Sequence, residues 1–164
     1  MLDAKSLMVF GLLTWLISSA STAYGSLTLN IVPGNWCLSI SDADLLAGPG
    51  SNLQPVYEDT GSPTYLDVSG TSGVSDNWRI DVKRVDSLWN PNMSLAVKRT
   101  SDGTGPGSIT GGESYQEIGP TDIAFFSGAG DRSNVPLQME LSGMSLQVAP
   151  NTYSTSIVYT VVDL

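Results

Sequence analysis

Acidic side chains are the groups in this sequence whose type and spacing could do chemistry. The chain has 16 Asp and Glu residues against seven Lys and Arg, and it contains no histidine. Carboxylates at Asp42 and Asp44, at Glu58 and Asp59, and at Asp102 could offer oxygen ligands to calcium from loops. None of these sets has the spacing of an EF-hand. The sequence therefore favours solvated acidic loops, and we predict no metal site.

The absence of histidine removes several kinds of catalysis. Ser-His-Asp and Cys-His mechanisms need an imidazole base, and the ordinary zinc and copper sites need imidazole ligands. Cys37 is the single cysteine, so an intrachain disulfide is excluded as well. Its setting in Trp36-Cys37-Leu38 predicts a small, buried apolar residue, although pairing between two chains stays open.

Two short motifs look catalytic at first sight. The run Asp59-Thr60-Gly61 resembles the signature of aspartic proteases, in which two carboxylates share a proton. Here Glu58 precedes it and Pro63 follows it closely, so a turn between strands is the better interpretation. The glycines of 103–107 lack the Lys and Ser/Thr of a phosphate-binding loop. We predict no enzyme and no cofactor, and we keep a carboxylate-based hydrolase as a minor alternative.

Tryptophan could serve a different purpose, because exposed aromatic rings can stack against sugars. Trp36 and Trp78 occupy apolar positions in segments where apolar and polar residues alternate, so we expect both in the core. Trp89 lies beside Asn90 and Pro91, outside these alternating segments. It is the candidate for a ligand-stacking residue on the surface.

The first 25 residues read as an export signal that precedes the domain. Lys5 supplies a positive charge, the apolar run 7–17 has the length of a signal core, and small residues follow it. Cleavage after Ala23 or after Gly25 satisfies the small-residue rule, and an uncleaved membrane anchor is the alternative. We predict a signal peptide at 1–25 and a domain at 26–164 that is secreted or displayed on the cell surface.

The charge of the chain bears on its partners. A formal net charge of −9 argues against nucleic acid, which binds proteins through Lys and Arg contacts to phosphates. It also argues against anionic membrane surfaces, so we expect membrane contact only through the signal segment.

Alternation of apolar and polar residues is the main structural signal after residue 25. It predicts eight or nine short strands separated by Gly and Pro, and no long helix outside the leader. This pattern favours an all-β fold, a single Ig-like, Greek-key β-sandwich. The expected strands are 27–31, 36–40, 65–68, 78–84, 93–100, 114–118, 123–126, 135–141 and the terminal run 151–162. We also expect 78–84 and 93–100 to be neighbours.

The terminal run is the longest of these strands. Tyr153, Ile157, Tyr159 and Val161 share one face at period two, and this face is the better core candidate. A strand so long and so apolar would attract another chain if it were a bare edge. We therefore expect it to lie inside a sheet or to complete one.

The same terminal run, entered through Pro150-Asn151-Thr152-Tyr153, resembles the last strand of bacterial fimbrial and spore-coat-U-like secreted subunits. This resemblance implies a structural subunit of a pilus, fibre or surface coat that assembles by donor-strand exchange, in which the N-terminal strand of one subunit fills a gap in the next. Leu27, Leu29 and Ile31 have the spacing that such a groove needs. The implied partners are copies of the chain or related subunits, with an assembly chaperone. The alternative is a secreted carbohydrate- or surface-binding module.

Overall fold

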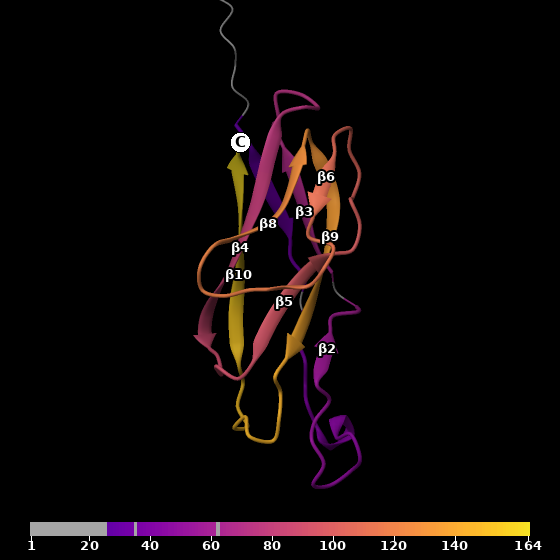
Figure 1. The fold of residues 1–164 in the computed structure, drawn as a ribbon, viewed down its shortest axis with the longest axis vertical. Coiled ribbons are helices and arrows are strands. Elements are labelled where there is room, and N and C mark those ends of the chain that lie inside the picture. Colours follow the sequence, from indigo (N-terminus) through magenta and orange to yellow (C-terminus); the bar gives the residue numbers. More distant parts are fainter. Residues whose placement is uncertain (1–25, 35, 62) are drawn as a thin grey trace, which may run out of the picture.

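The computed structural model of the chain describes residues 26–34, 36–61 and 63–164, and it is all-β. The strands form two antiparallel sheets that face each other as a β-sandwich (Figure 1). A single 3-10 turn, η1 at Asp42–Asp44, is the helical element of the described residues. Within the same residues, no helix is both long and apolar enough for a membrane crossing. The predicted signal peptide lies outside the described residues.

The larger sheet has six strands in the order β1-β3-β9-β5-β7, with β2 pairing on β9. Two of its inner strands, β9 and β5, are in register from Ser94 opposite Ser142 to Arg99 opposite Leu137. The bounds of its strands are β1 Thr28–Val32, β2 Val56–Glu58, β3 Thr64–Ser69, β5 Ser94–Arg99, β7 Gln116–Glu117 and β9 Arg132–Ser142.

The smaller sheet has four strands in the order β10-β4-β8-β6. From β3 onward the chain passes to the opposite sheet at every connection, so sequence neighbours are rarely sheet neighbours. The bounds of these strands are β4 Asn77–Leu88, β6 Ile109–Gly111, β8 Ile123–Ala129 and β10 Ser154–Asp163.

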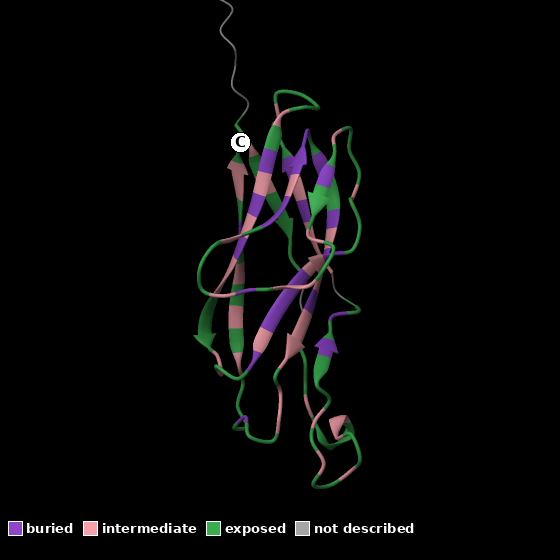
Figure 2. Cartoon of the chain, viewed as in Figure 1, coloured by how far each residue is buried: buried purple, intermediate pink, exposed green. Residues whose placement is uncertain are grey.

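The core lies between the sheets and is built by period-two alternation on both of them (Figure 2). Trp78, Ile80 and Val82 of β4 are fully buried, as the sequence predicted. The indole Nε1 of Trp78 donates a hydrogen bond to the carbonyl of Gly130 at 2.8 Å, so this buried polar atom is satisfied. The larger sheet contributes Leu66, Val68, Val97, Val135 and Leu137.

The terminal strand has the predicted face but not the expected place in its sheet. Tyr159 of β10 is buried, and Ile157 and Val161 pack against the core. Within the described residues, however, β10 pairs with β4 alone and is an edge strand. The expected pairing of 78–84 with 93–100 is wrong, because β4 and β5 belong to opposite sheets.

Two local expectations fail at the start of the domain. Residues 36–40 alternate like a strand but form none, because no neighbouring strand is placed to pair with them. Cys37 in this segment is exposed, not buried. Trp36 is half-buried and packs against the core, while Trp78 is fully enclosed.

Substitutions at Tyr159 test this core. Its hydroxyl is buried without a hydrogen-bond partner in the described part of the chain, and burial raises the pKa of this phenol. We expect Tyr159→Ala to lower the free energy of unfolding by about 3–5 kcal/mol through the lost ring. Tyr159→Phe removes only the unpaired hydroxyl, so it should be neutral or stabilise by about 1 kcal/mol. Urea unfolding measures both, and a marked loss in Tyr159→Phe would contradict this placement.

Candidate functional site

The N-terminal strand β1 closes one side of the sandwich and is held there by one sheet neighbour. It pairs antiparallel with β3, with Leu29 opposite Val68 and Ile31 opposite Leu66. Val68 and Leu66 are almost completely buried, so β1 covers part of the core. β1 also contacts β10, the edge strand of the other sheet, near the top of the molecule in Figure 1.

The three predicted donor-strand residues lie together on β1 and its N-terminal approach, but they are unequally buried. Leu27 and Leu29 are half-buried and pack against the core, whereas Ile31 is 37% exposed. Thr28, between them, points the other way and is exposed. The apolar spacing therefore places an inward row of side chains on a strand whose outer face is polar.

Each end of β1 has a specific anchor in the turn or strand beside it. Gly70 has a φ of +83°, and a Cβ atom there would lie 2.4 Å from the carbonyl oxygen of Ser26. Glycine is therefore required where the start of β1 passes the turn after β3. At the other end, the N–H of Gly34 donates to the hydroxyl of Thr64 at 3.0 Å.

The chain between β1 and β2, residues 33–55, is a long connection that meets the sandwich at Gly34, which bonds to Thr64, and at Trp36, which packs against the core. Between residues 36 and 55 the recorded hydrogen bonds join residues of the connection to each other, such as Leu46 N–H to the Asn52 carbonyl at 2.9 Å and Gln54 N–H to the Asp44 carbonyl at 3.1 Å. In Figure 1 this segment hangs below the two sheets. β1 is thus joined to its domain by a hinge that could span about 75 Å if fully extended.

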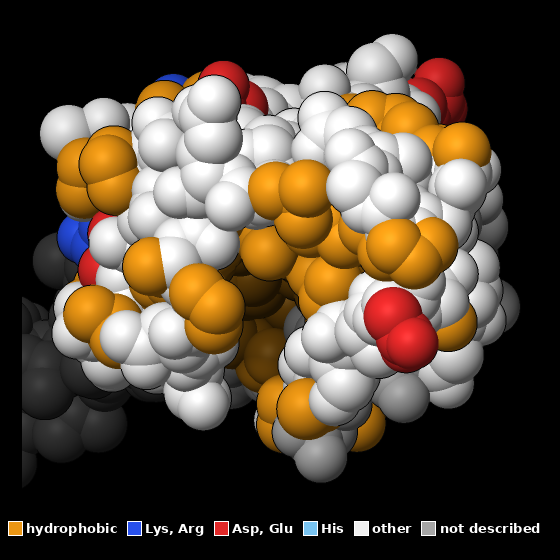
Figure 3. Space-filling model, turned by 90° about the horizontal axis from the view of Figure 1, so that it is seen from below, with side chains coloured by type: hydrophobic (Ala, Val, Ile, Leu, Met, Phe, Trp, Pro, Cys, Tyr) orange, Lys and Arg blue, Asp and Glu red, His pale blue; other side chains and the backbone are white. Residues whose placement is uncertain are grey.

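The lower end of the molecule, from which this hinge leaves, is apolar and hollowed. Figure 3 views that end and shows hydrophobic side chains gathered around a hollow. Exposed apolar residues lie on the hinge, at the start of β2, at the end of β4 and in the loop between β9 and β10. They are Leu38, Leu46, Val56, Leu88 and Leu146. An exposed apolar patch of this kind indicates a contact surface.

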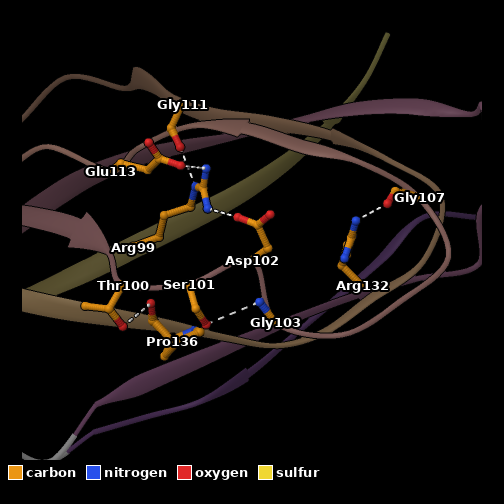
Figure 4. Close-up of polar contacts among 10 residues, drawn as sticks. All are labelled: Arg99, Thr100, Ser101, Asp102, Gly103, Gly107, Gly111, Glu113, Arg132 and Pro136. Carbon is orange, nitrogen blue, oxygen red and sulfur yellow. Dashed lines mark hydrogen bonds and ion pairs between the residues drawn. The ribbon is translucent and has the colours of Figure 1, made fainter.

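The opposite side of the sandwich is closed by a polar cluster around Arg99 (Figure 4). The Arg99 side chain is only 2% exposed and donates to Asp102, to Glu113 at 2.8 Å and to the carbonyl of Gly111. Its two carboxylate partners are largely exposed. The guanidinium therefore fastens the end of β5 to the loop after it, to the end of β6 and to the residues just after β6.

Sequence reasoning missed Arg99, although a signal was present. Met93, Leu95, Val97 and Arg99 alternate along one face, and all four are buried. A cation that continues the apolar phase of a strand must find acceptors inside the fold. Here those acceptors come from the loop that follows the strand, from the end of β6 and from the connection after β6.

Three of the side chains with displaced pKa values fall in two places. Burial raises the pKa of Tyr57 on β2, and burial with a hydrogen bond to Glu58 raises that of Tyr115. These two tyrosines are neighbours through Glu58, the residue that follows Tyr57. The hydroxyl and N–H of Thr71 lower the pKa of Asp131, which lies between β8 and β9. Within the described residues, no group of three or more His, Cys, Asp or Glu side chains is placed to hold a metal ion.

Trp89 is less accessible than the sequence suggested for a stacking residue. It is half-buried against the core, and its indole Nε1 donates to the carbonyl of Met93 at 3.0 Å. The guanidinium of Arg84 lies 4.5 Å from the ring centroid, in a cation–π contact. One face of the ring is therefore already occupied by the protein itself.

The Asp-Thr-Gly run forms a turn, the interpretation favoured from its sequence. Asp59 is buried, and its Oδ1 accepts the N–H of Gly61 at 3.1 Å. This is the side-chain-to-backbone bond of an Asx turn.

Comparisons of the chain with protein-family models, with curated proteins and with solved structures gave no match. The site is therefore interpreted from its own geometry.

Substitutions around Arg99 test its role as a loop fastener. Arg99→Ala should lower the free energy of unfolding by about 3 kcal/mol, because it removes a buried cation that several acceptors share. Glu113→Gln should cost less than about 1 kcal/mol, since that carboxylate is 75% exposed. Lys83→Ala is the matched control, because it removes a cation from the exposed pair with Asp122. Equal effects of Arg99→Ala and Lys83→Ala on chemical unfolding would contradict this role.

Proposed function

We propose that this chain is an exported, non-enzymatic structural subunit of a pilus, fibre or surface coat. In this proposal its N-terminal strand joins it to a neighbour by donor-strand exchange. Its partners are copies of itself or related subunits, and an assembly chaperone could hold it before assembly. Export rests on the sequence of residues 1–25.

One observation carries the proposal: β1 covers the core at an open side, bonded to a single strand and tethered by a long hinge. A neighbour's β1 would make the same contacts with Leu66 and Val68 as the chain's own β1 does. Exchange of an identical element costs little in contact energy, so the outcome depends on hinge length and local concentration. The hinge at 33–55 is long enough to reach a second subunit.

The apolar lower end is consistent with such an assembly. An exchanged β1 would leave its own domain from this end, because the hinge begins where β1 finishes. A neighbouring subunit would then be held close to the hollow seen in Figure 3 and could cover its exposed side chains.

The finer fold assignment belongs to the same proposal. We infer an Ig-like, Greek-key sandwich, because strands β3 to β10 alternate between the two sheets and sequence neighbours seldom pair. A carbohydrate-binding module remains the other function class. We prefer the structural subunit because Arg84 covers a face of Trp89, the one residue predicted to stack against a ligand.

A charge placed on the inner face of β1 tests the exchange. Leu29→Asp should abolish polymers, because it would bury an unpaired carboxylate against the core of the acceptor. Thr28→Asp is the matched control, since it adds the same charge to the exposed face of the same strand. Negative-stain electron microscopy and light scattering of the purified mature protein measure polymer formation.

A peptide supplies the second arm of this experiment. The segment from Ser26 to Asn35, added in excess to Leu29→Asp, should occupy the vacated position and raise its melting temperature by mass action. Normal polymers of Leu29→Asp, or an unchanged melting temperature at high peptide excess, would rule out donor-strand exchange.

A further inference from the structure

The strand β10 leaves the smaller sheet with a long edge that pairs with no strand of the described chain, although β1 of the other sheet contacts β10. It runs from Ser154 to Asp163 and, within the described chain, hydrogen-bonds to β4 alone. Proteins usually protect such edges with lysine, proline, bulges or short strands. β10 has ten residues, no lysine or proline, and an irregular register only at Ser154 and Thr155. Its edge is therefore free to pair with another strand.

The residues of β10 that bond to β4 alternate with residues whose backbone N–H and C=O groups point outward, and one hydrogen bond shows which are which. The N–H of Leu164 donates to the carbonyl of Asn77 at 3.1 Å, in register with the ladder between β10 and β4. Bonding alternates along an antiparallel pair, so the even-numbered residues of β10 bond to β4. The N–H of Arg84 agrees with this alternation, because it points away from β10 to the carbonyl of Gly119. The outward N–H and C=O groups belong to Ile157, Tyr159, Val161 and Asp163.

The side chains follow the same odd and even division. Tyr159 and its odd-numbered neighbours Ile157 and Val161 face the core, whereas Ser156, Val158 and Thr160 are exposed on the outer face. A partner strand must place its own apolar side chains on the core face, since a register shift by one residue would move them to the solvent-exposed face.

The local charge also permits a second copy to approach. The chain as a whole carries −9, but β10 has one charged residue, Asp163, at its end. Its neighbour β4 carries three of the seven basic residues and two acidic ones, so β4 has a small positive net charge. The basic residues are Arg79, Lys83 and Arg84, and the acidic ones are Asp81 and Asp86. The surface beside this edge is thus less acidic than the rest of the protein.

We propose that β10 is a docking edge for β10 of a second copy, in an antiparallel pair about a two-fold axis through Tyr159. In this register Ile157 lies opposite Val161 of the second copy, and Val158 lies opposite its Thr160. The outward N–H and C=O groups of each β10 meet those of the other, and the core-facing side chains of both strands lie on the same face of the joined sheet. Asp163 lies opposite Thr155, so no like charges oppose each other. The two small sheets become one continuous sheet.

A second copy fits this edge better than an unrelated peptide, because the strand is complementary to itself. Both the bonding groups and the inward side chains fall at odd positions, as a two-fold axis through an odd residue requires. The dimer does not depend on donor-strand exchange, since β1 belongs to the other sheet.

Lysines on the outer face of β10 test the pairing. The double variant Val158→Lys, Thr160→Lys would place lysines opposite each other across the axis. It should weaken the dimer by about 100-fold or more, because opposed like charges cost several kcal/mol. Ser108→Lys, Thr110→Lys is the matched control, as it adds the same charge to exposed residues at β6, the other edge of the sheet. In the Leu29→Asp background, in which exchange of β1 should form no polymers, sedimentation equilibrium of the mature chain should give a dimer without further substitution and with the control, and single copies with the β10 lysines.

Amide exchange measured by NMR on the Leu29→Asp protein provides an independent readout. Dilute samples should show fast exchange at Ile157, Tyr159 and Val161 and slow exchange at Val158 and Thr160. Concentrated samples should protect the amides of all five residues. Leu29→Asp protein that stays a single copy at every concentration, a dimer that survives the β10 lysines, or odd-numbered amides that still exchange fast in the dimer would each overturn the proposal.

Discussion

Two sheets that share one core must be closed along both of their open sides, and the behaviour of this protein depends on how each side is closed. The inner faces of the sheets bury Trp78, Ile80 and Leu66 between them, which removes most of the apolar surface from water. The core side chains do not cover these open sides. The buried cation Arg99 and the residues that it binds close one side, and the N-terminal strand β1 closes the other.

The two closures differ in how easily they can be undone. Arg99 is bound by acceptors that are all within fourteen residues of it, so its closure belongs to the local chain. β1 lies 33 to 41 residues from its partners on β3 and is followed by a connection whose bonds are mostly its own. Its closure is non-local, and in the proposed exchange another copy supplies it. This asymmetry supports a subunit with one permanent side and one exchangeable side.

The sequence predicted well what period-two alternation controls. The buried face of β4 and the core face of β10 both follow from it, because side-chain direction in a strand is a local property. Pairing is not local, so the expected neighbours β4 and β5 fall in opposite sheets, and the terminal strand is an edge. Residues 36–40 alternate but meet no partner strand, which leaves Cys37 exposed. The inward row of Leu27 and Leu29 was foreseen, whereas the hinge that makes exchange feasible required the structure.

The exchange of β1 is the central claim, and a designed cysteine pair tests it most directly. Thr28 and Ser69 are partner positions on β1 and β3, and both are exposed. Directly paired strand residues have Cα atoms about 4.5–5.5 Å apart, within the range that a disulfide spans. In a Cys37→Ser background, oxidised Thr28→Cys, Ser69→Cys protein should give a ladder of covalent oligomers on a non-reducing gel. A single band of one chain, from material that microscopy shows to be polymeric, would contradict donor-strand exchange.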